Sequence, residues 1–139
     1  MKYFKFLTLF VIVTMLQGCP QINDDDVLVG TINIVNDSED TIYCGCPLVS
    51  ENAINSNDFS ENLVREIKIE SKSERKYSYY ENQFKGNYNK KIWILIYKQS
   101  TLDNYSWEEI QEQNLYDKRY SFTLDELDAI NWQLVYDGN

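Results

Sequence analysis

The stretch Lys91-Ile92-Trp93-Ile94-Leu95-Ile96-Tyr97 decides the fold of this chain. Every residue from 92 to 97 is apolar or aromatic, so the segment presents the same kind of surface on both faces of a strand. It is shorter than the roughly 10 to 12 residues expected of a buried helix. The pattern is typical of a central strand with both faces covered. We therefore expect neighbouring elements to pack on each side of it.

Shorter segments on both sides of this stretch have strand character. Residues 27–35 alternate, with Leu28, Gly30, Ile32 and Ile34 on one face. The polar run 36–40 (NDSED) predicts a turn, since these side chains bond their own backbone, and it lacks the glycine and closing glutamate of a calcium loop. Further strands are expected at residues 41–43, 64–70, 115–121 and 132–136, with a loop over 50–62, a charged turn over 71–76 and a strand end at Pro47.

Two helix starts stand in the last third of the chain. Ser106 is followed three residues later by Glu109, and Thr123 by Glu126, so both sites read as capping boxes. Hydrophobic staple positions accompany them, at Tyr105 with Ile110 and at Phe122 with Leu127. The first-turn carboxylates Glu108, Glu109, Asp125 and Glu126 suit the helix dipole. We interpret them as capping groups and not as catalytic acids.

These patterns together predict a mainly β fold. We expect one domain over residues 27–139, an antiparallel β-sandwich of the Ig-like type with two short helices near the C-terminus. An α+β sheet with helices on one face is the alternative. One domain of this length is long enough for a single hydrophobic core.

The N-terminal residues have the pattern of an export signal. A short basic start is followed by the apolar run 6–16 (FLTLFVIVTML), which is well short of the about 20 residues that span a membrane. Residues 1–18 are therefore predicted to be a signal peptide.

The run closes on Leu16-Gln17-Gly18-Cys19, which resembles a bacterial lipobox. That resemblance implies cleavage after Gly18 and a diacylglycerol on the thiol of Cys19, so that lipid holds the mature chain on the outer membrane. An ordinary secretory signal with an incidental cysteine is the alternative. Residues 19–26 then form an acidic tether, in which Asp24, Asp25 and Asp26 are either a solvated spacer or, by resemblance to Bacteroidota lipoproteins, a signal for export to the cell surface. We prefer the cell surface to the periplasmic face.

Charge and composition exclude several functions. The net charge of −9 falls to −11 when Lys2 and Lys5 leave with the signal, and such a chain repels nucleic acid. The absence of histidine rules out Ser-His-Asp and Cys-His catalysis. We expect no cofactor, no metal site and no catalytic residue, and a macromolecular partner that is basic or neutral.

Two features carry weaker chemical hints. With Cys19 lipidated, Cys44 and Cys46 are expected to form one strained disulfide, with a redox role as the alternative, while zinc would need more ligands. The aromatic run Tyr77-Ser78-Tyr79-Tyr80, with Phe84 nearby, offers rings that either stack on a sugar or fill a sandwich core.

The last third of the chain resembles a group of small uncharacterised Bacteroidota lipoproteins. The resemblance is carried by YSWEEI (105–110), KRY (118–120), TLDEL (123–127) and Asn131-Trp132. It implies a small lipid-anchored β-rich domain and brings no activity with it.

Two functional hypotheses follow, neither of them enzymatic. The first is a surface-exposed binding or accessory module whose partner is a glycan, a host protein or another envelope protein. The second is a periplasmic inhibitor or immunity-type protein that neutralises a basic partner, because opposite charges steer association.

Overall fold

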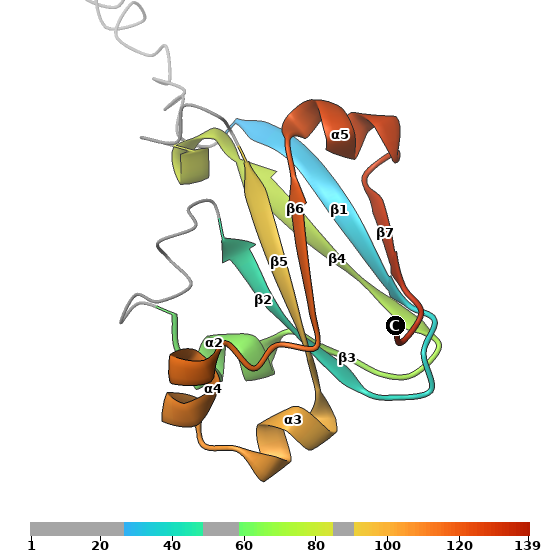
Figure 1. The fold of residues 1–139 in the computed structure, drawn as a ribbon. Coiled ribbons are helices and arrows are strands. Elements are labelled where there is room, and N and C mark those ends of the chain that lie inside the picture. Colours follow the sequence, from blue (N-terminus) through green and yellow to red (C-terminus); the bar gives the residue numbers. More distant parts are fainter. Residues whose placement is uncertain (1–26, 49–58, 85–90) are drawn as a thin grey trace, which may run out of the picture.

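The computed structural model describes residues 27–48, 59–84 and 91–139, apart from the side chains of residues 46–48 (Figure 1). The strands are β1 (Leu28–Asn36), β2 (Ile42–Leu48), β3 (Lys68–Ile69), β4 (Ser73–Tyr80), β5 (Ile92–Lys98), β6 (Lys118–Phe122) and β7 (Gln133–Tyr136). The helices are α2 (Glu61–Glu66), the 3-10 turn η3 (Glu81–Phe84), α3 (Gln99–Asn104), α4 (Trp107–Gln113) and α5 (Leu124–Ala129).

The strands form two sheets. One has four strands in the order β3-β2-β5-β6, all antiparallel, and the other has three in the order β4-β1-β7. In the three-stranded sheet β4 is antiparallel to β1, whereas β7 is parallel to it. The mainly β architecture with two packed sheets confirms the predicted fold class, and the helix layer described below gives it an α+β character.

The inner faces of the two sheets enclose the main core. Ile32 and Ile34 of β1 meet Ile92, Ile94 and Ile96 of β5, and all five are nearly inaccessible to solvent. Elements β4, α5 and β7 add Tyr79, Leu127, Leu134 and Tyr136, and the core also contains Ile42, Cys44, Ile67, Ile69 and Phe84. Alternation along β1 therefore sends one side chain in two into the sandwich, as the sequence predicts.

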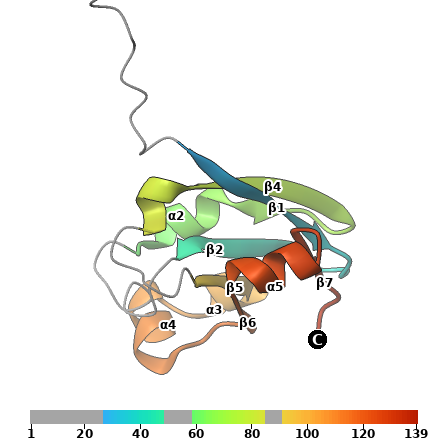
Figure 2. The same ribbon diagram turned by 90° about the horizontal axis from the view of Figure 1, so that it is seen from above.

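A second core lies on the outer face of the four-stranded sheet. Trp93, Leu95 and Tyr97 point away from the sandwich and pack under Val64, Leu102 and Ile110 of α2, α3 and α4. Figure 2 shows β1 and β4 on one side of the four-stranded sheet, with α3 and α4 on the other. All six residues of the 92–97 stretch are buried, which confirms the expectation that both faces of this strand are covered.

Both predicted C-terminal helices are present with their capping boxes. The Ser106 side chain accepts from the backbone N–H of Glu109, whose carboxylate accepts from the N–H of Ser106, and Thr123 and Glu126 repeat the arrangement in α5. The short helices α2 and α3 are additions that the sequence patterns do not predict.

Four local predictions are wrong. Leu28, expected on the face of Ile32 and Ile34, is 54% exposed, since the register between β1 and β4 shifts between Leu28 and Gly30. Residues 61–66 form α2, held by the Arg65–Glu61 ion pair of 2.7 Å, so only Lys68 and Ile69 of the predicted strand 64–70 are extended. The predicted turn 71–76 is shorter, because Lys72 alone adopts a positive φ of 55° and β4 already begins at Ser73. Strand β2 continues through Pro47, since a register shift between Gly45 and Leu48 relieves the ladder there.

The predicted turn at 36–40 is confirmed. The side chain of its first residue, Asn36, is buried and makes several hydrogen bonds. Asn36 is inaccessible to solvent, and its amide donates to the carbonyl oxygens of Asp40, Ile69 and Glu70 at 2.7, 3.2 and 3.0 Å. Its Oδ1 accepts from the N–H and the hydroxyl of Ser38. One side chain thus ties the β1–β2 turn to the end of β3.

Gly30 is required by a close approach. A Cβ at this position would lie 2.3 Å from the ring of Trp132. The glycine therefore lets the residue before β7 close over β1, and the N–H of Asn33 donates to the carbonyl of Trp132 at 2.7 Å.

Candidate functional site

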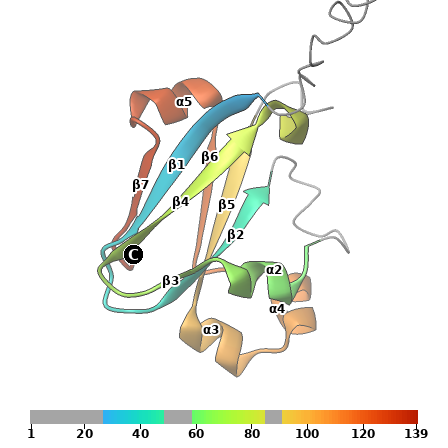
Figure 3. The same ribbon diagram turned by 180° about the vertical axis from the view of Figure 1, so that it is seen from behind.

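The most distinctive surface of the described chain is the end that carries α3 and α4, where β5 leaves the sheet and β6 enters it (Figures 1 and 3). We define the acidic end as residues 99–117. This run contains Asp103, Glu108, Glu109, Glu112 and Asp117, and it contains no Lys or Arg. All five carboxylate residues are exposed.

Packing holds the acidic end rigidly on the sheet. Leu102 of α3 and Ile110 of α4 are buried against the outer face of β5. The half-buried ring of Trp107 contacts the rings of Phe59 and Tyr97, with centroids 5.6 and 6.1 Å apart. The carboxylates are therefore displayed on anchored helices and not on a free segment.

The two ends of the run are fixed to each other by Asp117. Its Oδ2 accepts from the backbone N–H of Lys98 and from the hydroxyl of Thr101, both at 2.8 Å. At the start of α3, the Tyr43 hydroxyl bonds Oε1 of Gln99 at 2.5 Å. These contacts hold the junction between β5 and α3 against the segment that leads into β6.

The carboxylates of this end have no cationic partner among the described residues. Two bases beside this end bond other groups: Lys98 pairs with Asp40 at 3.2 Å, and Arg65 pairs with Glu61 and donates to the backbone carbonyl of Leu102. The Ser106 N–H and hydroxyl hold the pKa of Glu109 below its usual range, so this group stays ionised. The acidic end therefore concentrates five carboxylates between Lys98 on one side and Lys118 and Arg119 on the other.

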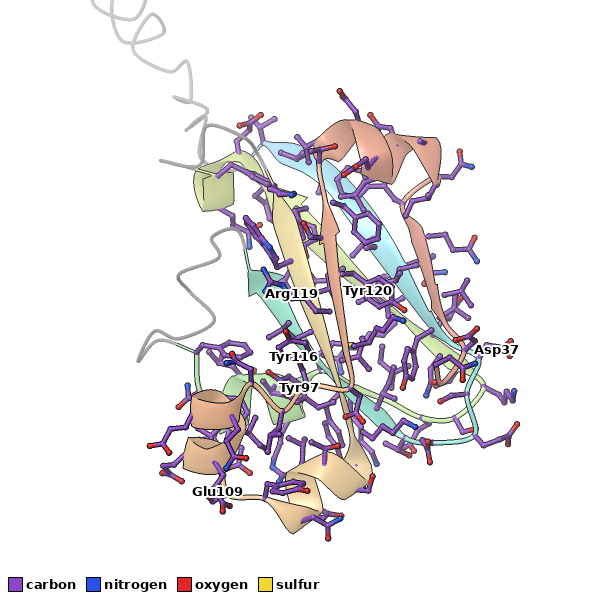
Figure 4. The ribbon with its side chains drawn as sticks, in the orientation of Figure 1. Asp37, Tyr97, Glu109, Tyr116, Arg119 and Tyr120 are labelled. Atoms are coloured by element: carbon purple, nitrogen blue, oxygen red, sulfur yellow. The ribbon has the colours of Figure 1, made fainter. Side chains whose placement is uncertain are left out.

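An aromatic side chain stands among these charges. Tyr105, between α3 and α4, is 48% exposed. Glu109, labelled on α4 in Figure 4, lies one turn along from it. A partly exposed tyrosine within a run that carries five exposed carboxylates can make both apolar and charged contacts, which is the composition of an anchor point in protein interfaces.

Behind this surface, Tyr97 is a structural group. It is 3% exposed, and burial raises its pKa well above the ordinary value of a tyrosine, with smaller contributions from Tyr116 and Asp117. Figure 4 shows Tyr97 and Tyr116 close together below β6. A buried neutral phenol of this kind supports the sheet and is not available as a base.

The predicted lipidation site and tether fall outside the described residues: Gly18, Cys19 and Asp24 to Asp26 all precede residue 27. Cys44 is fully buried in the main core, whereas the side chain of Cys46 is not described. The disulfide between them stays a prediction. Across the ranges 27–48, 59–84 and 91–139, no three His, Cys, Asp or Glu side chains are grouped as metal ligands.

The aromatic run on β4 is core and not a sugar platform. Tyr79 is inaccessible, Phe84 is 5% exposed, and Tyr77 packs edge-on against Tyr79 with centroids 5.2 Å apart. Only Tyr80 of the run is exposed, at 40%. The stacking alternative for this patch is therefore wrong, because period-two alternation turns Tyr77 and Tyr79 inward.

Sequence reasoning recognised the capping carboxylates but not the surface that they form. The signal was present as a run of residues without a single base between Lys98 and Lys118. Its significance depends on α3 and α4 both packing on one sheet face, which brings the charges to one end.

Comparisons of the chain with protein-family models, curated proteins and solved structures find no significant match. Within the part of the chain that the structure describes, no helix has the length and apolar character needed to cross a bilayer.

Proposed function

We propose that this chain is a lipid-anchored, non-enzymatic binding module of the cell envelope that engages a basic protein partner through its acidic end. The observation that carries the proposal is the base-free run 99–117, which holds five exposed carboxylate residues and the exposed side chain of Tyr105. The anchor rests on the lipobox-like Leu16-Gln17-Gly18-Cys19.

A protein partner is favoured over a glycan for a physical reason. The rings best suited to stack on a sugar are buried inside the sandwich, whereas the exposed chemistry is negative charge with one aromatic anchor. Complementary charge raises the association rate and selects against acidic competitors. A basic surface with a recess for Tyr105 is the matching partner.

The decisive experiment places a photo-crosslinking benzoylphenylalanine at Tyr105 in intact cells, with Val135 as the control site because it is equally exposed but lies on β7. We expect an adduct with a basic protein from position 105 only. The affinity of the purified pair should fall steeply between low and high salt. A salt-independent affinity, or the same adduct from both sites, would contradict the proposal.

Charge variants sharpen this test. Glu112→Lys reverses one charge on the acidic end and leaves a Glu108–Lys pair at i,i+4, which α4 tolerates. We expect the affinity to fall by about ten-fold, which is typical of reversing a charge at an interface. Asp125→Lys on α5 makes the same change in net charge away from α3 and α4 and should have little effect.

The second candidate is a periplasmic inhibitor or immunity-type protein, which the same acidic end favours. Location separates the two. Protease treatment of intact cells should remove a tag placed after Asn139 if the module faces outward, with a periplasmic protein as the leakage control. Protection of the tag would favour the periplasmic inhibitor. It would also contradict the interpretation of Asp24 to Asp26 as a signal for export to the cell surface. Cys19→Ala should release the protein from the membrane in either case.

A further inference from the structure

A small apolar patch lies at the end of the sandwich opposite the acidic end. We define the apolar tip as Val27, Leu28 and Tyr80, which are 46%, 54% and 40% exposed. Leu28 and Tyr80 are register partners across β1 and β4, so their side chains are neighbours. Leu28 is the first residue of β1 and Tyr80 is the last residue of β4, while Val27 directly precedes β1.

The backbone of the tip is well fixed. The N–H of Glu81 donates to the carbonyl of Val27 at 2.9 Å, and the N–H of Tyr80 donates to Oε1 of Gln83 at 2.7 Å. These bonds join the start of β1 to the turn η3. The three exposed side chains therefore belong to a part of the backbone that hydrogen bonds hold in place.

The place of the tip in the chain suggests what covers it. Val27 is the first described residue, and α3 and α4 lie at the other end of the sheets (Figures 1 and 3). Only residues 20–26 separate Val27 from Cys19. Seven residues span at most about 25 Å even when fully extended, so a lipid on Cys19 would keep this end of the domain next to the bilayer.

We infer that the apolar tip rests on the membrane and orients the module. This inference rests on the lipid anchor of the proposed function. Tyrosine and aliphatic side chains are the residues that settle at the interface between head groups and acyl chains. Because the chain is strongly acidic, the surface that the tip contacts is one of neutral head groups.

Orientation follows from this contact. The start of β1 lies at one end of the sheets, and α3 and α4 lie at the opposite end (Figures 1 and 3). With the tip on the bilayer, the acidic end projects away from it. The exposed Tyr105 and its carboxylates are then presented to the aqueous phase, where a partner can reach them.

The test uses full-length protein lipidated in cells and reconstituted into vesicles of phosphatidylcholine and phosphatidylethanolamine. Benzoylphenylalanine replaces Tyr80 in one sample and Tyr105 in the other, since both tyrosines are exposed but stand at opposite ends. After flotation and illumination, we expect lipid adducts from position 80 and none from position 105. Adding Leu28→Asp should lower the lipid adduct at position 80 by on the order of ten-fold, because a carboxylate avoids the interface.

The outcomes separate the inference from its premise. Protein that floats with the vesicles but gives no lipid adduct at position 80, or crosslinks there to a protein or to a second copy, overturns the orientation and leaves the anchor intact. Protein that does not float lacks the anchor, which overturns the proposed function and this inference with it. Equal lipid adducts from positions 80 and 105 also overturn the orientation.

Discussion

The two sheets of this protein differ in how many of their faces are covered. The four-stranded sheet has the main core on one face and α2, α3 and α4 on the other, so β5 is buried from Ile92 to Tyr97. Within the described ranges, the three-stranded sheet contributes only its inner face to a core cluster, and Thr31, Asn33 and Ser78 lie on its outer face. The difference shows that apolar side chains on both faces of one strand recruit a helix layer, whereas alternation leaves a solvated face.

The largest effect should come from the shared core. Ile94→Ala removes a side chain with no exposure from between the sheets and should lower the free energy of unfolding by about 2 to 5 kcal/mol. Val135→Ala, on the open face at 49% exposure, should change it by less than about 0.5 kcal/mol. Chemical denaturation of both variants measures the contrast, and equal effects would contradict the assignment of an open face.

The next test compares two asparagines of β1 on opposite faces. Asn36→Ala deprives three carbonyl groups of their donor and should cost about 2 to 4 kcal/mol. Asn33→Ala, whose amide donates to the exposed carboxylate of Glu74, should cost about 1 kcal/mol or less. Thermal unfolding distinguishes them. A larger loss for Asn33 would mean that the outer face carries more structure than its exposure indicates.

Gly45→Ala probes how tightly the second core, under α2, α3 and α4, is packed. The added Cβ would lie 2.6 Å from the ring of Phe59 and 3.3 Å from the Cβ of Leu95. We expect a loss of about 1 to 3 kcal/mol from overpacking. Ser78→Ala on the open face is the matched control and should be nearly neutral. A Gly45→Ala variant with the same denaturation midpoint as the wild type would show that the second core is loosely packed.

Removing a helix cap from the layer of α2, α3 and α4 should have a smaller effect on the free energy of unfolding. Ser106→Ala removes the acceptor for the Glu109 N–H and should cost about 1 kcal/mol. The same change at Thr123 tests α5, which lies outside that layer.

Acid should weaken both caps in the same way. Hydrogen bonds from Ser106 and Thr123 lower the pKa values of Glu109 and Glu126 in the folded chain. Their contribution is therefore present above the unfolded pKa of a glutamate and is lost as pH falls through the lower folded value. Wild-type stability should decline with acid more steeply than that of the Ser106→Ala variant, as measured by urea midpoints from pH 6 to pH 2.

The smallest effect near neutral pH belongs to Tyr97. Burial raises its pKa, so its contribution is full below about pH 10, where free tyrosine begins to ionise, and is lost as pH rises above that value. Tyr97→Phe should leave stability at pH 7 little changed and reduce the alkaline loss. Lys98, whose pKa is raised mainly by its hydrogen bond to Asp40, should keep part of that loss in the variant. An identical alkaline profile for the variant and the wild type would contradict this role.

Much of the fold was predictable because local patterns and tertiary packing agree. The stretch 92–97, the alternation of β1 from Gly30 to Ile34, the turn after Asn36 and both capping boxes were all expected and are all present. The exceptions lie where two structures fit one pattern. Ile67 and Ile69 fit the alternation of a strand, and Ile69 does lie in β3, but Val64 belongs to α2 and packs in the second core against the outer face of β5.

The candidate site was less predictable for a related reason. Charge along residues 99–117 is visible in the sequence, but the sequence does not say whether those residues gather on one surface. Aromatic character at 77–80 was equally visible, and the burial of Tyr79, with Tyr77 packed against it, made the patch part of the core. Chemistry is fixed by residue type, whereas exposure is fixed by what packs above each residue.

By itself, then, the sequence determined the central strand, the two capped helices, the negative charge and the absence of histidine chemistry, because these depend on residue identity and short-range spacing. Only the tertiary structure decided that β7 runs parallel to β1, that α2 and α3 join α4 over the second core, and that the apolar tip and the acidic end stand at opposite ends. Those features depend on contacts between residues far apart in the chain. Local propensity does not encode such contacts, and the burial of apolar surface selects them.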